Sequence, residues 1–386
     1  MEYVLMHKDV EVAHVSIDDR SGYALRIISV ENSRYMPVGT MVCGHADTDR
    51  FRDWWSKRSI PASRSNIRDL LDALEISDTR ALLTKSLGLS LSDHYWIHPP
   101  DREIAWSSVN YFENPFSDDI GDLLFGKTVE RGVIDLSSPD NTSDGNLRKR
   151  WKVINGRRRL VKGGTGFANQ EPFNEAIASR ICEALDIPHV EYSVLWNSDR
   201  PYSVCDDFVT TGTELVSAHR AMLTRTRRND ESPYTHYVRS CTELGVDIVP
   251  SLDRMLVLDY IIGNVDRHTN NFGLLRDADT LDYIGPAPVF DSGSSLGWNL
   301  RTEEITGMAG LDCKPFEKRS SDQIRLVESF DWIDFDALEG FYPDIEAIMD
   351  SSKGFIDPAR RDAVMGFVRR RVGELRSMAN DSRRHR

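Results

Sequence analysis

The sequence predicts an α+β fold, because strand-like and helix-like patterns occupy different parts of the chain. Apolar and polar residues alternate near 1–42 and again within 151–209, with the two-residue period of β-strands. Apolar residues recur at three- and four-residue intervals within 49–91, and the chain is mostly helical in pattern from residue 218 onward. A turn-rich stretch at 137–145 precedes the second group of strands.

The bulk composition excludes several classes of protein. A chain of 386 residues can bury a sizeable core and suggests two to three domains. A net charge of −13 argues against direct nucleic-acid binding by the chain's surface as a whole. The five cysteines are scattered without a Cys-x-x-Cys pair, as expected for reduced thiols. With no signal-peptide pattern and no apolar run of membrane-spanning length, we expect a cytoplasmic protein.

The first 125 residues give few functional signals. Asp18, Asp19 and Gly22 separate two alternating runs and predict strand, turn and strand. His94 and His98 have a four-residue spacing that could hold a metal on a helix, but no carboxylate or cysteine completes the set. The following Pro99 and Pro100 also interrupt a helix. We therefore expect these histidines to be core or surface residues.

A loop and a hairpin follow. Asn155-Gly156 stands between the alternating runs 151–154 and 160–162, which is a strong hairpin signal. Lys162 ends the second run, where a strand lysine could reach a phosphate group. The preceding loop could cradle phosphates with its backbone amides, and its candidate residues are Thr142, Ser143, Asp144 and Gly145. The loop contains neither Gly-x-Gly-x-x-Gly nor Gly-Lys-Ser/Thr, so alone it is also consistent with a polar surface turn.

Positive charge is concentrated around this hairpin. Eight Lys or Arg residues and no Asp or Glu lie between Leu147 and Lys162. Such a patch could face a triphosphate, an acidic partner or solvent.

The next helix is predicted to start near Pro172. Phe173, Ile177 and Ile181 form an apolar stripe with a spacing of four residues. Glu175 lies on a neighbouring face, where it could pair with Lys162.

Three polar residues carry the strongest functional signal. Asn271 follows Asp266 by five positions, and Asp291 comes after a short predicted hairpin. The catalytic Asp and the metal-binding Asn of protein kinases have this spacing, and a second metal-binding Asp follows them. Asp266 would accept the proton of an attacking hydroxyl, while Asn271 and Asp291 offer the oxygen ligands that Mg²⁺ prefers. His268 could act as a general base instead, although a structural role beside Asp266 fits its neighbours better.

The conjunction of these residues resembles the HipA-like kinases. Gly263-Asn264-x-Asp266-x-His268-x-x-Asn271-x-Gly273 is followed by Asp291-x-Gly293-Ser294. Ordinary protein kinases have His-Arg-Asp, whereas the Asp comes first in Asp266-Arg267-His268, as in HipA-like kinases and more distantly in lipid kinases. Asn174-Glu175 also resembles the opening of the key helix in that family. The resemblance covers about 137–295.

The resemblance implies a bilobal protein-kinase-like fold with a mixed β-sheet N-lobe and a helical C-lobe. The expected divisions are an N-terminal accessory domain at 1–125, the N-lobe at 126–215 and the C-lobe at 216–386. It implies ATP and Mg²⁺ as cofactors, with adenine bound by the backbone near Asp207 and Phe208. It further implies transfer to a serine or threonine hydroxyl, and autophosphorylation of Ser138, Thr142 or Ser143 in the phosphate-binding loop.

The resemblance also suggests partners. Some HipA-like toxins phosphorylate glutamyl- or tryptophanyl-tRNA synthetase, and many pair with a small helix-turn-helix antitoxin. Two other functions stay open: an ATP-binding pseudokinase that acts as an interaction module, and a nucleotidyl (AMP) transferase. A lipid kinase is disfavoured because no membrane-binding segment is evident.

Overall fold

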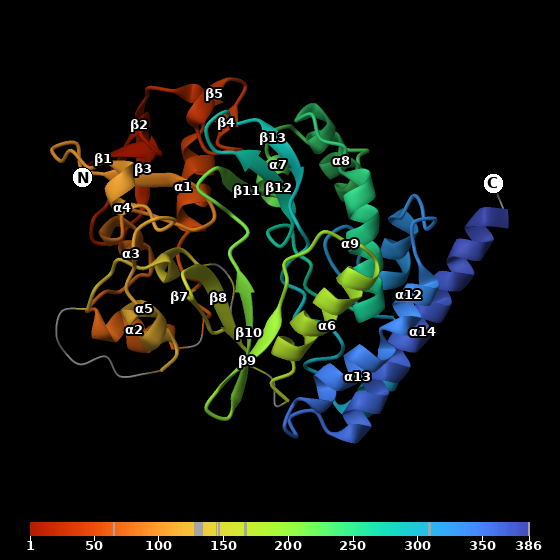
Figure 1. Ribbon diagram of the computed structural model, residues 1–386. Helices are drawn as coiled ribbons and strands as arrows, with labels where there is room; N and C mark the ends of the chain where they lie inside the picture. Colours follow the sequence, from red (N-terminus) through yellow and green to blue (C-terminus); the bar gives the residue numbers. More distant parts are fainter. Residues whose placement is uncertain are drawn as a thin grey trace.

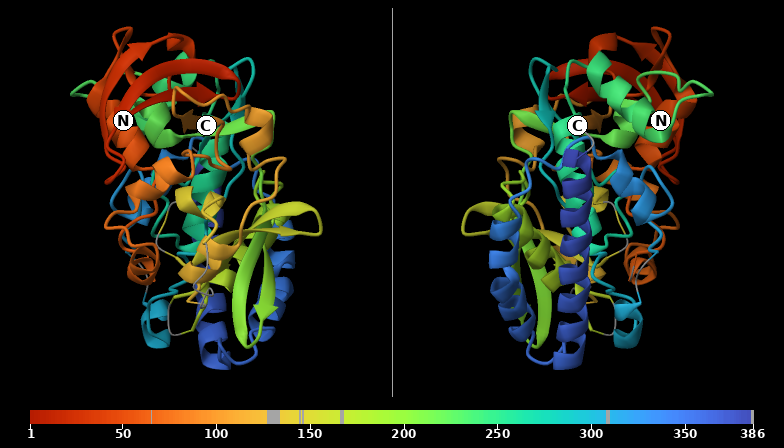
Figure 2. Two further views of the ribbon diagram at one scale, coloured as in Figure 1. Left: turned by 90° about the vertical axis from the view of Figure 1, so that its left-hand side faces the viewer. Right: turned by 90° about the vertical axis from the view of Figure 1, so that its right-hand side faces the viewer.

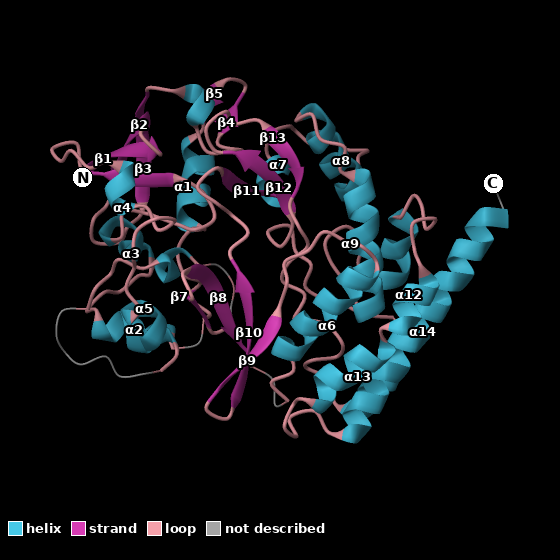
Figure 3. Cartoon of the chain, in the orientation of Figure 1, coloured by secondary structure: helices cyan, strands magenta, loops and turns pink. Residues whose placement is uncertain are grey.

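The computed structural model describes residues 1–64, 66–126, 134–143, 145, 147–165, 168–307 and 310–384. In Figure 1 the N-terminal region lies on one side, small sheets occupy the middle and long helices cover the opposite side. Figure 3 shows the same division by secondary structure. No helix among these residues is both long and apolar enough to cross a membrane.

The N-terminal region contains a four-stranded sheet in the order β3-β2-β1-β6. Its strands are β1 (Glu2–His7), β2 (Val10–Ile17), β3 (Ala24–Val30) and β6 (Tyr95–His98). Helix α1 (Thr48–Ser56) contributes buried Phe51, Trp54 and Trp55 to the core that this sheet covers. The smaller elements are η1 (Ser33–Tyr35), β4 (Met41–Val42), β5 (His45–Ala46), α2 (Ile67–Ala73), α3 (Arg80–Lys85), α4 (Trp106–Val109) and α5 (Asp119–Leu124).

The second sheet has the order β7-β8-β10-β9. It consists of β7 (Lys149–Ile154), β8 (Arg157–Gly163), β9 (Ser193–Asn197) and β10 (Arg200–Asp206), preceded by η2 (Pro139–Thr142). The predicted turn is present: Asn155 and Gly156 have φ of 52° and 75°, as a two-residue hairpin with the right-handed strand twist requires. Every described strand pair in this sheet is antiparallel, so the expected mixture of strand directions is wrong for it. Two of the pairs are hairpins, whose short turns force antiparallel pairing.

Helix α6 (Glu171–Ala184) crosses behind this sheet and connects it to the helical part. It is buried on several faces, which include the apolar stripe of Phe173, Ile177 and Ile181 and also Glu175. The helix therefore carries a charged residue into the interior between the second sheet and the helical part.

The C-terminal part combines a third sheet with helices around an apolar core. The sheet has the order β11-β12-β13, formed by β11 (Thr213–Ser217), β12 (Gly273–Asp277) and β13 (Tyr283–Pro286). The core helix α9 (Val249–Ile262) is apolar on nearly all sides. The long α14 (Pro358–Arg384) packs against it, runs along the right-hand edge of the molecule in Figure 1 and faces the viewer in the right-hand view of Figure 2. The other elements are α7 (Ala218–Met222), α8 (Pro233–Glu243), α10 (Thr302–Thr306), α11 (Ser320–Gln323), η3 (Ile324–Leu326), α12 (Phe335–Gly340) and α13 (Tyr342–Asp350).

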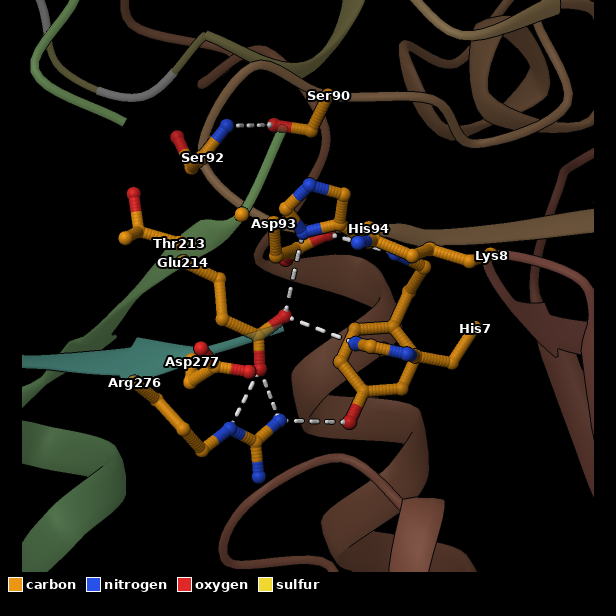
Figure 4. A network of polar contacts seen from close by, with 12 residues as sticks. His7, Lys8, Ser90, Ser92, Asp93, His94, Thr213, Glu214, Arg276 and Asp277 are labelled. Carbon is orange, nitrogen blue, oxygen red and sulfur yellow. Dashed lines mark hydrogen bonds and ion pairs between the residues drawn. The ribbon is translucent and has the colours of Figure 1, made fainter. Parts of the chain in front are cut away.

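A buried polar network centred on Glu214 joins the N-terminal region to the third sheet. Figure 4 shows His7, His94 and Arg276 pointing toward the Glu214 carboxylate. His7 Nε2 lies 3.0 Å and His94 Nδ1 3.6 Å from Glu214 Oε2, whereas Arg276 contacts Oε1 and donates to Tyr95 Oη at 3.1 Å. All these side chains are at most 5% exposed. His94 is therefore a core residue that meets a carboxylate distant in sequence, which its spacing from His98 did not reveal.

Candidate active site

The loop after α9 is built to present Asp266. Gly263 ends the helix with φ 59°, in the left-handed conformation that favours glycine at this position. Asn264 then donates from its backbone to Asp259 O at 2.9 Å and from its side chain to Asp259 Oδ1 at 3.0 Å. Its Oδ1 accepts from the Asp266 N–H at 3.0 Å, so the Asp266 backbone is fixed while its carboxylate stays 43% exposed.

Arg267 ties this loop to the segment that carries Asp291. Its side chain is fully buried and pairs with Asp259 at 2.9 Å. It also donates to Asn271 O at 3.2 Å, to Phe290 O and to Ser292 Oγ at 2.9 Å. Both candidate metal-binding segments are thus held by one guanidinium whose planar fork of donors suits several acceptors at once. The sequence pattern does not indicate this role for Arg267.

Lys162 is the centre of a second buried charge cluster. Its Nζ lies 3.0 Å from Glu175 Oε1, the predicted partner, and 2.7 Å from Asp291 Oδ1, a residue predicted as a metal ligand. The backbone N–H of Ser292 donates to Glu175 Oε2 at 2.8 Å and holds the glutamate from the other side. Asp291 has φ 58°, a conformation that residues other than glycine rarely adopt and that is often found at functional sites.

The pKa values of this cluster reflect burial and mutual attraction. Burial alone would lower the pKa of Lys162, but Asp291 and Glu175 raise it well above its ordinary value. Burial raises the pKa of Asp291, and the stronger effect of Lys162 moves it well below its ordinary value. Asp291 is therefore an ionised carboxylate at neutral pH, which is the form that a divalent cation requires.

A cavity of about 190 Å³ brings most of the predicted site residues together. Its lining includes Thr142, Ser143, Gly145, Lys162, Asp207, Phe208, His268, Asn271 and Asp291. Glu175 stands behind Lys162, and Asp266 is not among the lining residues. Asp144 lies outside the described residues of the predicted phosphate-binding loop, residues 137–145, which is called the phosphate loop below.

The donor set at this cavity suits Mg²⁺. Asn271 Nδ2 donates to Asp266 O at 3.3 Å, so the amide oxygen is the atom available to a cation. Together with the ionised Asp291 it provides hard oxygen ligands. The predicted pair of metal-binding residues thus faces one cavity with appropriate chemistry.

The N-terminal region forms part of the cavity wall. Ser90, Leu91 and Ser92 line it, and Leu89 O accepts from Thr142 Oγ1 at 2.9 Å. The buried Arg64 donates to Ser143 Oγ at 2.6 Å. It also contacts Ser143 O, and it donates to Gly145 O at 2.8–2.9 Å. The phosphate loop is therefore fixed by a residue 79 positions earlier in the chain, a contact that local sequence patterns do not encode.

The phosphate loop itself holds a buried acid. Asp140 accepts from the Trp151 N–H at 2.8 Å, and burial raises the pKa of its carboxyl to about 7. Of the three candidate autophosphorylation sites, Thr142 and Ser143 line the cavity. The side chains of Ser138 and Ser143 are at most 8% exposed. Phosphorylation of either serine therefore requires the loop to leave this position.

The predicted adenine-binding segment lies at the same cavity. The Asp207 N–H already donates to Arg158 O at 2.9 Å, and the Phe208 ring packs against Phe290 at 5.3 Å between centroids. Burial raises the pKa of Asp207 to about 8. Adenine recognition here would have to use groups other than the Asp207 N–H.

The positive patch mostly faces the protein's own carboxylates. Arg150 contacts Asp122, and both Arg157 and Arg159 pair with Asp206. From this run Lys149 and Lys162 reach the cavity. The sequence had left a triphosphate, an acidic partner and solvent open, and most of this charge is used within the chain.

Comparison with known proteins identifies the fold. No protein-family model and no curated protein sequence matches the chain. HipA of Shewanella oneidensis MR-1, solved in complex with HipB and operator DNA, has a TM-score of 0.52 and 11% identity, covering 97% of this chain and 99% of that one. The Helicobacter pylori proinflammatory kinase CtkA has a TM-score of 0.45 and 17% identity, covering 60% of this chain and 94% of that one. The expected α+β kinase-like architecture is confirmed, and the chain has the HipA-like kinase fold.

Proposed function

We propose that the protein is an ATP- and Mg²⁺-dependent serine/threonine protein kinase of the HipA-like class. The observation that carries this proposal is the contact of Lys162 with both Glu175 and Asp291, at 3.0 and 2.7 Å, beside Asn271 in one cavity. A strand lysine, a helix glutamate and a metal-binding pair are the parts that protein kinases use to position a triphosphate.

The reaction follows from the positions of these groups. The acceptor hydroxyl oxygen forms a bond to the γ-phosphorus, and the bond to the bridging oxygen of ADP breaks. Asp266 accepts the hydroxyl proton, since its carboxylate is partly exposed on a fixed backbone. Lys162 binds phosphate oxygens, and Glu175 keeps it oriented from the interior. Asn271 and Asp291 would hold Mg²⁺, which supplies charge compensation for the phosphates.

Nucleotide binding requires the cluster to rearrange. Lys162 Nζ donates to Asp291 Oδ1 at 2.7 Å, and a metal ion at Asp291 would compete with that ammonium group. The phosphates of ATP would give Lys162 a new anionic partner as Asp291 turns to the metal.

The proposed kinase would have two kinds of protein partner, a substrate and an antitoxin. The acceptor would be a protein hydroxyl, in the chain's own loop and in a substrate such as an aminoacyl-tRNA synthetase or another translation factor. A small DNA-binding antitoxin is a second proposed partner, supported by the whole-chain fold likeness to HipA, which was solved with HipB. Purification from the native host followed by mass spectrometry of co-eluting proteins would test this partner. A cytoplasmic location stays a prediction.

The intact mass of dephosphorylated protein after incubation with Mg-ATP tests the activity. We expect a phosphate-sized gain in the wild type, mapped to Ser138, Thr142 or Ser143 in the 137–145 loop, and none in Asp266→Ala or Asp291→Ala. A nucleotide-sized gain would indicate AMP transfer instead. Tight ATP binding without any gain would indicate a pseudokinase and contradict the catalytic roles.

A further inference from the structure

Lys314 makes a contact with the proposed catalytic base that the reaction above does not use. Its Nζ lies 2.7 Å from Asp266 Oδ1, and the two side chains are 55% and 43% exposed. A surface ion pair of this kind usually contributes little to stability. Its place at the reacting group therefore calls for an explanation other than stability.

The loop that carries Lys314 is held by hydrogen bonds within itself and to the interior. Cys313 N donates to Lys318 O at 2.9 Å and Ser320 N to Leu311 O at 3.0 Å, so the two sides of the loop are bonded together. The buried Gln323 donates to Lys314 O at 2.8 Å. Its Oε1 accepts from Phe316 N at 3.1 Å. The backbone of Lys314 is thus held by an interior side chain.

Phe316 anchors the same loop in the core. Its ring is 7% exposed and packs against Tyr234, Tyr237 and Phe272, with centroids 5.3–6.2 Å apart. Phe272 directly follows the candidate metal ligand Asn271. The loop is therefore anchored beside Asn271, at the end of the proposed catalytic loop (residues 263–273), and the flexible stem of Lys314 reaches over Asp266.

The proposed catalytic loop, residues 263–273, contains one arginine or lysine, Arg267. Arg267, next to Asp266, is fully buried against Asp259. His268 lines the cavity, and its Nδ1 lies 3.3 Å from the N–H of Asn270. A groove of about 400 Å³ is lined by Lys314 and by Val265, the residue before Asp266.

We propose that Lys314 is a catalytic residue that pairs with Asp266 in the free enzyme and contacts the transferring phosphoryl group during the reaction. This inference rests on the proposed kinase function. The base must lie within about 3 Å of the attacking oxygen, which in turn lies about 3–3.5 Å from the phosphorus. An ammonium that touches the base can therefore reach the phosphoryl oxygens by a small rotation of its stem.

The bonds and charges of the step balance without any covalent role for Lys314. The acceptor oxygen bonds to the γ-phosphorus, ADP leaves with the electron pair of the broken P–O bond, and the hydroxyl proton passes to Asp266. Lys314 remains an ammonium and offsets the charge on the phosphoryl oxygens as they transfer. When it leaves Asp266, the carboxylate becomes available to the incoming hydroxyl.

Three variants test this role in the full-length protein. Lys314→Gln removes the charge, Lys314→Arg retains it, and Lys318→Gln is a matched control on the same exposed loop. We expect Lys314→Gln to lower the rate of phosphoryl transfer at saturating Mg-ATP by about 100-fold, as for the loss of one charge-stabilising group. Lys314→Arg should recover at least about tenfold of this loss, because a guanidinium still carries the charge. Lys318→Gln should match the wild type.

Binding measurements separate a catalytic role from a structural one. Mg-ADP should bind Lys314→Gln as it binds the wild type, whereas Mg-ADP with aluminium fluoride, which mimics the transferring group, should bind at least about tenfold more weakly. Wild-type transfer rates in Lys314→Gln would overturn the inference, as would an equal loss of affinity for both ligands. If the wild type itself transfers no phosphate, the proposed function fails, and this inference fails with it.

Discussion

Two buried clusters of charged side chains, one at the cavity and one at the junction with the N-terminal region, differ in access and in charge balance. At the cavity, Lys162 faces two carboxylates, and Asp291 is 29% exposed. At the junction, Glu214 faces the permanent cation Arg276 and two imidazoles, and every member is at most 5% exposed. The open cluster with surplus negative charge can exchange partners with a ligand, whereas the closed one links the N-terminal region to the third sheet.

The largest expected effect concerns activity at the open cluster. Asp291→Asn should lower phosphoryl transfer by at least about 1000-fold, because the substitution removes the negative charge of a metal ligand and the metal positions the phosphates. The free energy of unfolding of Asp291→Asn should differ from that of the wild type by less than about 1 kcal/mol, since Lys162 keeps Glu175 as a partner. Rate assays and urea unfolding measure the two effects, with the exposed Asp282→Asn as control. A collapse in stability would show that both clusters are structural.

The closed cluster should show the reverse pattern. Glu214→Gln leaves the buried guanidinium of Arg276 without its counter-charge, so we expect a loss of about 3 kcal/mol in the free energy of unfolding. Glu339→Gln, which removes a half-exposed pair with Arg376, should cost less than about 0.5 kcal/mol. Urea unfolding at pH 7 compares the two variants. Equal stabilities would refute the structural role of Glu214.

The loss of stability at acidic pH gives a second test of Glu214. The pKa of Glu214 is held well below its ordinary value, against the effect of burial, by the hydrogen bond with His7, by the nearby His94 ring and by Arg276. Its contribution to stability is fully present above the unfolded-state pKa of about 4.3 and is lost as pH falls toward the folded-state value. Between pH 5 and 3 the wild type should therefore lose about 2 kcal/mol more stability than Glu214→Gln. Parallel acid curves would contradict this linkage.

The smallest effect lies in the phosphate loop. Burial raises the pKa of Asp140 to about 7, so the folded state disfavours the ionised carboxylate and its cost grows as pH rises from about 4 to 7. Asp140→Asn should therefore become more stable relative to the wild type by at least about 1 kcal/mol between pH 5 and pH 8. Thermal unfolding at both pH values measures this difference. A pH-independent difference would place the Asp140 pKa near its ordinary value.

Local patterns predicted the parts of the fold and site that depend on neighbouring residues. The Asn155-Gly156 hairpin, the apolar stripe of α6 and the spacing of Asp266 and Asn271 all depend on residues within one element or loop. The ion pair of Lys162 with Glu175 could also be predicted, because only 13 positions separate the two residues and each has a recognisable place, one on a strand and the other on a helix.

Contacts between distant segments could not be predicted in this way. Glu214 meets His7 across 207 positions, Arg64 meets Ser143 across 79, and Lys314 meets Asp266 across 48. Periodicity reports which face of an element is buried, but it does not report which other element covers that face. A single sequence shows Arg64 and Lys314 as ordinary basic residues.

The Glu214 network and the Arg64 contacts determine how the chain can be divided. A fragment that starts at residue 126 would lose His7, His94 and the Ser90–Ser92 wall of the cavity, and would expose Glu214 and Arg276 to solvent. Its phosphate loop would also lose the guanidinium that holds Ser143 and Gly145. Expression of the kinase-like part alone should therefore give a poorly soluble product, and adding residues 1–125 as a separate polypeptide should restore it.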